Sequence, residues 1–593
     1  MKGSTLQIPL LMMMMMMIAL IFPAYVKANT ACCSFPCQNN GICSPTGRNG
    51  FICNCQNSGY YGTNCEYSTW KHWLLSFFQL LPEDIHSLLV GIPGFGCLLN
   101  MLPCRSYISR FLMQFRIGGY IHTLSYSMTV TNANDESMSL QILPSVPMNC
   151  PTPLGVAGES ILPPIDDVMS LFMRSMFKPD PMGSNLLFAT QADHLSHLFL
   201  KTGFSSLSEV SAMGYVYGET DRDNYLLRNH TNGKLKSQII NGEEWPPFLF
   251  ESPVDMQYPT GLPQTSQFAL GYEYYSVHSG HLMWSTLWLR QHNLFCDILV
   301  NEHPDWTDEQ LHQAARTAVL AMNIKIIVEE YIAHMARYYY SYVYTPEAVF
   351  QDGAQCKEFM LEEFKLLLHW HQMLPDQIAF NGTAYDMKDF LFQSQFLIQF
   401  GIGPYVEALI KQSAGRVTHH NHGPATILHA RKALLHARTL RLQSYNNYLR
   451  HFKLKTPKTF IELTGDWATA KELEEFYGDV EAVEFIVGVL CARRAPHAMF
   501  NLMVQEAGAL LSLQSLQSSL LYMKARGLLD NYGSIIVNNI VSMASYENLI
   551  CSNIKQPCPS VTLFVPWWDH YYEESFNLAE WDAEEKGCEL SEF

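Results

Sequence analysis

Seven of the 16 cysteines fall between Cys32 and Cys65, shortly after an apolar leader, and this arrangement limits what the start of the chain can become. The leader opens with a positive charge, is apolar over residues 10–22 and ends in small residues. The pattern predicts a secretory signal peptide over residues 1–28, with an uncleaved membrane anchor as the alternative. A secreted chain meets an oxidising compartment, so the clustered cysteines are candidates for disulfide bonds.

The cysteine spacing over residues 29–68, with Asn40-Gly41 and Tyr61-Gly62 at the turns, resembles an EGF-like module. A segment of this size cannot bury enough apolar surface without covalent cross-links. The resemblance implies the pairs Cys32–Cys43, Cys37–Cys53 and Cys55–Cys65. The seventh cysteine, Cys33, must pair outside the module or stay free. A zinc site is the alternative, which the oxidising compartment and the lack of histidine at ligand spacing disfavour.

Residues 69–117 carry short apolar runs that prolines interrupt, and no run is long enough to cross a bilayer. Basic residues outnumber acidic ones here, although the whole chain has a formal net charge of −17. Short amphipathic helices with aromatic faces and a basic rim favour binding in the plane of one membrane leaflet. A buried helical hairpin is the alternative.

The remainder, residues 118–566, shows helical periodicity without repeats or linkers, and predicts one large, mainly α domain. Thr307-Asp308-Glu309-Gln310 has the pattern of a capping box that starts a long helix running through Tyr331. The acidic residues 567–593 are expected to form a surface tail. The chain has no glycine-rich phosphate loop and no basic patch, so a nucleic-acid partner is not expected.

Leu368-His369-Trp370-His371 ends an amphipathic helical run that begins at Phe359. On a continuous helix, residues three apart share a face, so His371 and Leu368 would face one cavity while His369 points elsewhere. A buried histidine in such a position can hold a haem iron. Ordinary packing of histidines on an apolar helix is the alternative.

Taken together, these features resemble prostaglandin G/H synthase, the cyclooxygenase group of the animal haem peroxidases. The matching motifs run from Cys32 to Pro566; they are Ile142-Leu143-Pro144-Ser145-Val146-Pro147, Cys150-Pro151-Thr152-Pro153, Trp288-Leu289-Arg290-Gln291-His292-Asn293, Ile326-Ile327-Val328-Glu329-Glu330-Tyr331, Glu462-Leu463-Thr464-Gly465 and Tyr477-Gly478-Asp479. The resemblance also implies a Cys33–Cys150 disulfide and a Cys551–Cys558 disulfide.

The resemblance implies one haem b per subunit, with His371 as the proximal iron ligand and His197 as the distal histidine that moves a proton during peroxide cleavage. The family has Gln where this chain has Asp193, four residues before His197. An ionised carboxylate accepts hydrogen bonds but does not donate them, and it favours the protonated form of His197. We therefore expect peroxidase activity that is weakened or shifted in pH.

The second departure is Leu368, because the family has Tyr at this position. A phenol can form the radical that oxidises arachidonate, whereas an alkyl side chain cannot. The sequence thus predicts that the usual cyclooxygenase route is missing. The chain is either a paralogue that has lost oxygenation or a sequence altered at this codon.

Other positions match the substrate channel of the family. The matching residues are Ser512, Tyr338, Tyr331, Trp370, Gly508 and Glu506, with Arg116 as the candidate partner of the fatty-acid carboxylate. Asn229 and Asn381 begin glycosylation sequons. The last four residues, 590–593, only loosely resemble a retrieval signal for the endoplasmic reticulum.

Two hypotheses follow. The first is a haem peroxidase of the prostaglandin-endoperoxide synthase type, homodimeric and attached to the luminal leaflet of the endoplasmic reticulum and nuclear envelope, that acts on fatty acids or lipid hydroperoxides. The second is a non-catalytic paralogue that binds haem or lipid, or pairs with an active subunit.

Overall fold

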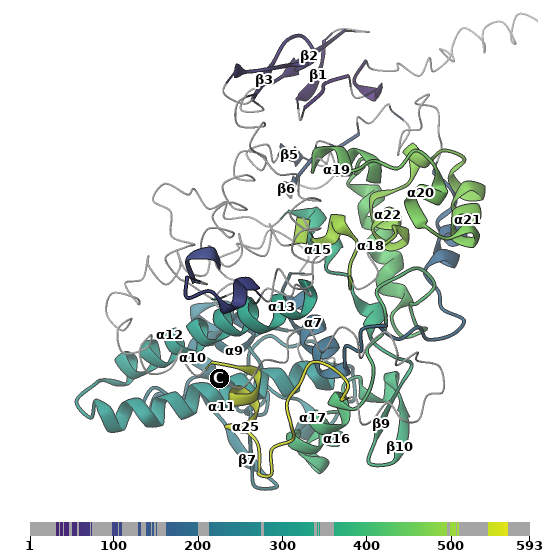
Figure 1. Cartoon of the computed structure of the whole chain (residues 1–593). Coiled ribbons are helices and arrows are strands. Elements are labelled where there is room, and N and C mark those ends of the chain that lie inside the picture. The colour runs from purple at the N-terminus through teal and green to yellow at the C-terminus, as the bar shows by residue number, and fades with distance from the viewer. Residues whose placement is uncertain are drawn as a thin grey trace, which may run out of the picture.

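The computed structural model describes most of the large domain and parts of the N-terminal region (Figure 1). The described residues are 31–34, 36–39, 41–46, 50–55, 59–70, 73, 98–104, 106–109, 128–131, 138–143, 145–146, 150, 162–199, 213–273, 278–336, 341, 343, 361–452, 454–494, 498–505, 507–508 and 544–566. The predicted signal peptide, the acidic tail and most of the segment 69–117 lie outside these ranges. Within them, no helix is long and apolar enough to span a bilayer.

The described part of the chain is mainly helical, as the sequence predicts. The helices are η1 (Ala31–Ser34), α6 (Ile165–Val168), η3 (Met169–Leu171), α7 (Leu186–Phe199), α9 (Gly214–Tyr217), α10 (Asp221–Leu227), η4 (Gln264–Ser266), α11 (Ser279–Glu302), α12 (Asp308–Ile326), η5 (Ile327–Tyr331), α13 (Ile332–Ala336), α15 (Glu362–Leu367), η6 (His371–Met373), η7 (Met387–Phe390), α16 (Ser394–Phe400), α17 (Ile402–Ile410), α18 (Ile427–Thr439), α19 (Tyr445–His451), α20 (Phe460–Thr464), α21 (Trp467–Tyr477), η8 (Val480–Ala482), α22 (Phe485–Cys491) and α25 (Tyr546–Cys551).

The strands described by the structure pair into short antiparallel hairpins and form no larger sheet. They are β1 (Ile42–Thr46) with β2 (Gly50–Asn54), β3 (Tyr60–Tyr61) with β4 (Tyr67–Ser68), β5 (Met128–Thr131) with β6 (Met138–Gln141), β7 (Gln238–Ile240) with β8 (Glu243–Trp245), and β9 (Gln377–Phe380) with β10 (Thr383–Asp386).

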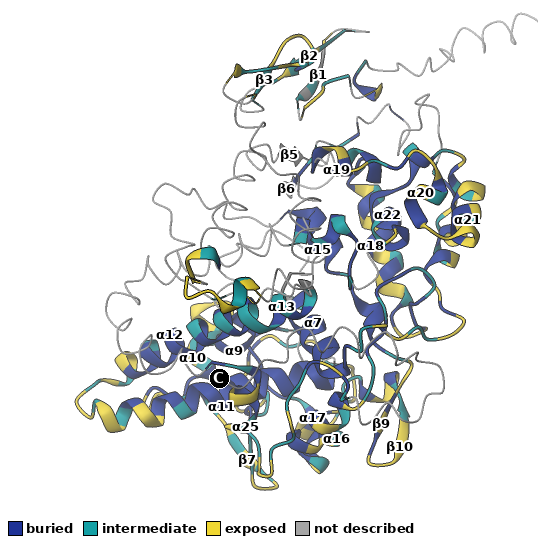
Figure 2. Cartoon of the chain, viewed as in Figure 1, coloured by how far each residue is buried: buried dark blue, intermediate teal, exposed yellow. Residues whose placement is uncertain are grey.

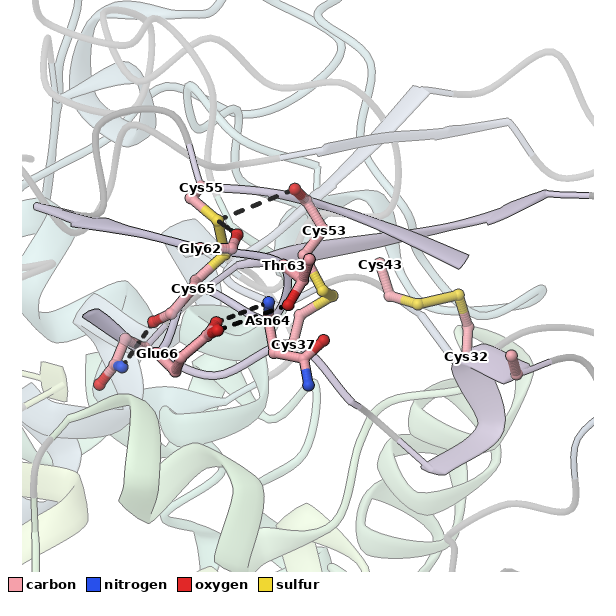
Figure 3. The surroundings of a disulfide bond; sticks show 12 residues. Cys32, Cys37, Cys43, Cys53, Cys55, Gly62, Thr63, Asn64, Cys65 and Glu66 are labelled. Carbon is pink, nitrogen blue, oxygen red and sulfur yellow. Dashed lines mark hydrogen bonds between the residues drawn. A yellow bond between two sulfur atoms is a disulfide. The ribbon is translucent and has the colours of Figure 1, made fainter. Parts of the chain in front are cut away.

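Disulfide bonds hold the N-terminal hairpins together (Figure 3). The bonds join Cys32 to Cys43, Cys37 to Cys53, and Cys55 to Cys65, as the EGF-like resemblance implies. Glu66 adds a local constraint, because its carboxylate accepts a hydrogen bond of 2.7 Å from the backbone N–H of Asn64. Two further bonds, Cys33–Cys150 and Cys551–Cys558, are also present. The first of these ties the N-terminal region to the large domain.

The two longest described helices, α11 and α12, pack against each other, and α7 packs against α11 (Figure 1). The capping box is present: the Thr307 hydroxyl accepts from the Gln310 N–H at 3.3 Å, and the Gln310 side chain accepts from the Thr307 N–H at 2.9 Å. The helical path then continues through η5 to Ala336. Every residue of α11 from Ser279 to Asn293 is buried, whereas its C-terminal end reaches the surface (Figure 2).

Glu363 in α15 joins three segments that are far apart in the sequence. Its Oε1 accepts hydrogen bonds from the Tyr448 hydroxyl at 2.7 Å and from the backbone N–H of Ile142 at 2.9 Å. Burial raises the pKa of the Glu363 carboxyl to about 7, although these hydrogen bonds act in the opposite direction. The carboxyl is therefore a proton-binding group in the core of the folded domain.

We predict that Glu363 makes the folded state less stable as the pH rises from about 4.5 to about 7. Over this interval the folded protein retains a proton that the unfolded chain, with a pKa of 4.5, has lost. The difference corresponds to roughly 3 kcal/mol at most. In Glu363→Gln, which keeps an acceptor oxygen but cannot ionise, this part of the pH dependence should disappear. Urea unfolding of both proteins at pH 5 and pH 8 gives the change in the free energy of unfolding between these two pH values. If this change is as large in Glu363→Gln as in the wild type, the assignment to Glu363 is wrong.

Candidate active site at the contact of α7, α11 and η6

Helix α7 carries two of the predicted site residues one turn apart. The helix starts after Asn185, whose side chain accepts a hydrogen bond of 3.1 Å from the Phe188 N–H and so satisfies one of the free N–H groups of the first turn. Asp193 and His197 then follow at a spacing of four residues, on one face of the helix. Asp193 is 9% exposed, and the His197 side chain is 19% exposed.

His371 lies across from this face, at the first residue of η6. Its Nε2 is 3.7 Å from Oδ1 of Asp193, and its ring centroid is 5.7 Å from that of His197. His371 is buried, and among the described residues neither of its ring nitrogens has a hydrogen-bond partner. Burial holds the pKa of the His371 imidazole well below its usual value, so the ring is neutral and has a free lone pair.

The segment before His371 differs from the sequence prediction. A continuous helix was expected through Leu368 and His371, but α15 ends at Leu367. The Leu368 N–H bonds to the Lys365 carbonyl at 3.3 Å and the Trp370 N–H bonds to the Leu368 carbonyl at 2.9 Å, so the chain makes a tight turn before η6 begins. Leu368 is buried in the main core, and its relation to His371 is set by this turn and not by one helical face.

Two more histidines, which the sequence analysis missed, come from the start of α11. His281 donates a hydrogen bond of 2.9 Å from Nε2 to Oδ2 of Asp193. His278 is the N-cap residue and accepts from the Gly280 N–H at 3.0 Å, and its ring lies 5.8 Å from that of His281. The available signal was the pair of histidines three residues apart at the start of an apolar helix, but no motif relates this pair to Asp193.

Gly280 lies where the start of α11 crosses α7. A Cβ atom at residue 280 would lie 2.9 Å from Nδ1 of the His278 ring and 3.1 Å from the Cβ and Cγ2 atoms of Thr190 on α7. The same crossing is held by a hydrogen bond of 3.3 Å from the Trp284 indole to the Thr190 hydroxyl. A side chain at residue 280 would therefore require these neighbours to shift by a few tenths of an ångström.

Asp193 is the central charge of the site. Burial alone would raise the pKa of its carboxyl, but the neighbouring His197 and the hydrogen bond from His281 outweigh burial and hold that pKa well below the usual range. His197 Nδ1 lies 3.5 Å from Oδ1 of Asp193 and donates a hydrogen bond of 2.9 Å to the backbone carbonyl of the same residue. The site thus contains one ionised carboxylate among several imidazoles.

Only part of the predicted substrate channel can be placed. Tyr331 ends η5 and packs on Phe188 with ring centroids 5.3 Å apart, while Trp370 packs on Phe500 at 4.6 Å. A Cβ at Gly508 would meet no atom of the described residues within 4 Å. The remaining predicted channel residues lie outside the described ranges; they are Ser512, Tyr338, Glu506 and Arg116.

Comparison with known proteins decides the family. Residues 202–507 match the family model for animal haem peroxidases. The chain is 35% identical to prostaglandin G/H synthase 1 of Oryctolagus cuniculus over 549 residues, which covers 90% of each protein. It is 35% identical to prostaglandin G/H synthase 2 of Gallus gallus over 553 residues, which covers 91% of this chain and 92% of the relative.

The chain belongs to the prostaglandin G/H synthases of the animal haem peroxidase family.

Two solved structures share the fold. Peroxidase A from Dictyostelium discoideum superimposes with a TM-score of 0.56 at 15% identity, covering 70% of this chain and 94% of that one. The fatty acid alpha-dioxygenase of Oryza sativa superimposes with a TM-score of 0.55 at 13% identity, covering 79% and 95%. Membership in this family of enzymes implies a haem cofactor.

The donor set suits haem in its chemistry. A haem peroxidase needs a neutral imidazole to hold the iron, and His371 offers one whose nitrogens are buried and without hydrogen bonds in the described part of the chain. The Asp193 carboxylate lies 3.7 Å from the His371 Nε2 atom and so borders the nitrogen that would hold the iron.

Proposed function

We propose that this protein is a haem-dependent peroxidase that reduces lipid hydroperoxides and lacks the tyrosyl route of its family to arachidonate oxygenation. The reaction takes a hydroperoxide, two protons and two electrons from a reducing cosubstrate to the alcohol and water. The observation that carries the proposal is the buried, neutral His371 opposite His197. Haem b, one per subunit and held by His371, supplies the redox chemistry when bound.

The residues of the chain supply orientation and proton transfer. His197 is fixed by its hydrogen bond to the Asp193 carbonyl, and its role is to take the proton from the attacking peroxide oxygen and return it to the departing one. Asp193, in place of the family Gln, contributes an acceptor already engaged by His281 and no donor for the peroxide. The pocket beside His197 therefore carries a negative charge and offers fewer hydrogen-bond donors than a pocket with the family glutamine would.

The proposal also covers the domain organisation and the location of the protein. We propose a signal peptide over residues 1–28, an EGF-like module over 29–68, a membrane-binding segment over 69–117 and a catalytic domain over 118–566. The protein would be a homodimer bound to one membrane leaflet on the luminal side of the endoplasmic reticulum and nuclear envelope. We also propose glycosylation of Asn229 and Asn381, because both residues are exposed and lie outside helices and strands. We propose that fatty acids enter past Tyr331 and Trp370, the described channel residues that the resemblance implies.

A non-catalytic paralogue is the second candidate, and the replacement of two reacting residues by Asp193 and Leu368 favours it. Absorption spectroscopy of the purified full chain with added hemin separates the two. The enzyme should show a Soret band and guaiacol turnover, whereas the paralogue would be folded and haem-free, and would form heterodimers with an active synthase.

We predict that His371→Ala abolishes the Soret band of the reconstituted protein, because the imidazole that would hold the iron is lost. His369→Gln, two residues away, should retain it and serves as the matched control. A Soret band of normal intensity in His371→Ala would remove this residue from haem binding.

We predict that Asp193→Gln raises the peroxidase rate at neutral pH by roughly tenfold, since it restores a hydrogen-bond donor near His197. The expected gain is smaller than the rate factor of about 10²–10⁴ that a whole proton-transfer group contributes, because His197 itself is unchanged. Guaiacol oxidation measured from pH 5 to pH 9 would also show a changed pH profile. Equal rates and profiles in both proteins would mean that Asp193 does not limit the reaction.

We predict that Leu368→Tyr gains oxygen uptake with arachidonate, because a phenol replaces the inert alkyl group. Leu368→Phe is the control, since it adds the ring without the hydroxyl, and it should stay inactive. Both substitutions enlarge a buried side chain at a cost of about 1–3 kcal/mol, so their unfolding curves should be compared. The rate of oxygen consumption with arachidonate is measured with an oxygen electrode. If folded Leu368→Tyr consumes no oxygen, the substrate channel is lost as well.

A further inference from the structure

We propose that Lys178, Arg416 and Arg494 together bind one oxyanion of the phosphate type. The three cations come from segments that are far apart in the sequence, and all three residues are partly buried. None of them belongs to the histidine site at α7, α11 and η6. The proposal therefore does not rest on the peroxidase function.

The backbone places Lys178 directly opposite Arg416. Pro179 and Gly415 form an isolated antiparallel bridge, and next to it the Arg416 N–H donates a hydrogen bond of 2.8 Å to the Lys178 carbonyl. Side chains that lie opposite each other in such a pair leave the backbone on the same face. Like charges in these positions repel each other, and an anion bound between them would remove the repulsion.

Asn421 fixes the two segments in this register. Its side-chain amide donates hydrogen bonds of 2.9 Å to the Lys178 carbonyl and 2.7 Å to the Arg416 carbonyl, and its oxygen accepts from the Lys178 N–H at 2.9 Å. Asn421 is fully buried, so water does not compete for these bonds. The backbones of the two cationic residues therefore cannot move apart without breaking a buried network.

Arg494 adds the third charge, from the segment that follows α22. Its Nη1 is buried and has no hydrogen-bond partner among the described residues. Burial, and then the repulsion from Arg416, lowers the pKa of the Arg494 guanidinium to about 9, and the same two causes lower the pKa of the Lys178 ammonium. Arg416 thus acts on both of the other cations. A buried guanidinium with an unused N–H donor is unfavourable until it meets an acceptor.

The acidic side chains near the cluster have other partners. Asp180 acts on Arg494, and Asp466 and Glu472 act on Lys178, but only through longer-range attraction. Asp466 caps α21, Asp180 accepts a backbone N–H at 3.1 Å, and Glu472 lies 2.9 Å from His420.

No salt bridge joins any of the three cations to an acidic side chain within the described ranges. Their charged N–H groups therefore remain available for a ligand. Charged donors from three segments suit a tetrahedral oxyanion, which offers acceptor oxygens on several sides, better than a planar carboxylate.

Isothermal titration of the full chain with inorganic phosphate, in detergent and phosphate-free buffer, tests the proposal. We expect one phosphate to bind per chain. Arg494→Gln and Lys178→Met should each weaken binding by at least about tenfold, because each removes a charged donor. Lys411→Met is the matched control, since Lys411 pairs with Glu407 at 2.8 Å and takes no part in the cluster, and it should bind phosphate like the wild type.

Thermal unfolding separates lost binding from misfolding. Phosphate should raise the melting temperature of the wild type and of Lys411→Met, but not that of Arg494→Gln or Lys178→Met, with a single cooperative transition in every protein. Dihexanoyl phosphatidic acid, a soluble lipid with a phosphate headgroup, identifies the source of the anion. Tighter binding of this lipid than of inorganic phosphate assigns a lipid headgroup, and the reverse order assigns a free anion. Absence of binding of both probes, or equal affinity in the wild type, Arg494→Gln and Lys178→Met, would overturn the proposal.

Discussion

The buried carboxylate of Asp193 organises the centre of this protein. It receives a hydrogen bond from His281 on α11, lies one turn before His197 on α7, and is 3.7 Å from His371 on η6. The histidines from α7, α11 and η6 therefore all lie next to the same carboxylate. Because a carboxylate in an apolar interior is stable only when surrounded by such partners, the histidine cluster and the aspartate depend on each other.

Leu368 and Asp193, the two positions that the resemblance marks as unusual, differ in their surroundings. Leu368 is a buried, apolar side chain in the main core and carries no phenol. Asp193 is a buried carboxylate, and His281 donates a hydrogen bond of 2.9 Å to it. The histidines on α7, α11 and η6 are thus arranged around one negative charge.

Much of this arrangement could be predicted from the sequence, and the reasons for the rest are local. His371 could be named from its helical pattern and His197 and Asp193 from the resemblance to the family, and the same resemblance implied the disulfide pairs. The contribution of His281 was not visible, because it depends on the close crossing of two helices at Gly280, which is a tertiary feature. The end of α15 was also missed: the periodicity of apolar residues continues through Leu368, but the backbone hydrogen bonds tighten and the helix stops there.

The Cys33–Cys150 disulfide has a topological consequence. It joins residues 117 apart in the sequence, so the whole stretch from the EGF-like hairpins through the predicted membrane segment forms one covalent ring closed on the large domain. A protease that cuts once anywhere within this ring opens it but releases no fragment, because the two pieces stay linked through the sulfur atoms. Nicked and intact molecules would share the same mass until a reducing agent separates them, apart from the water added at the cut.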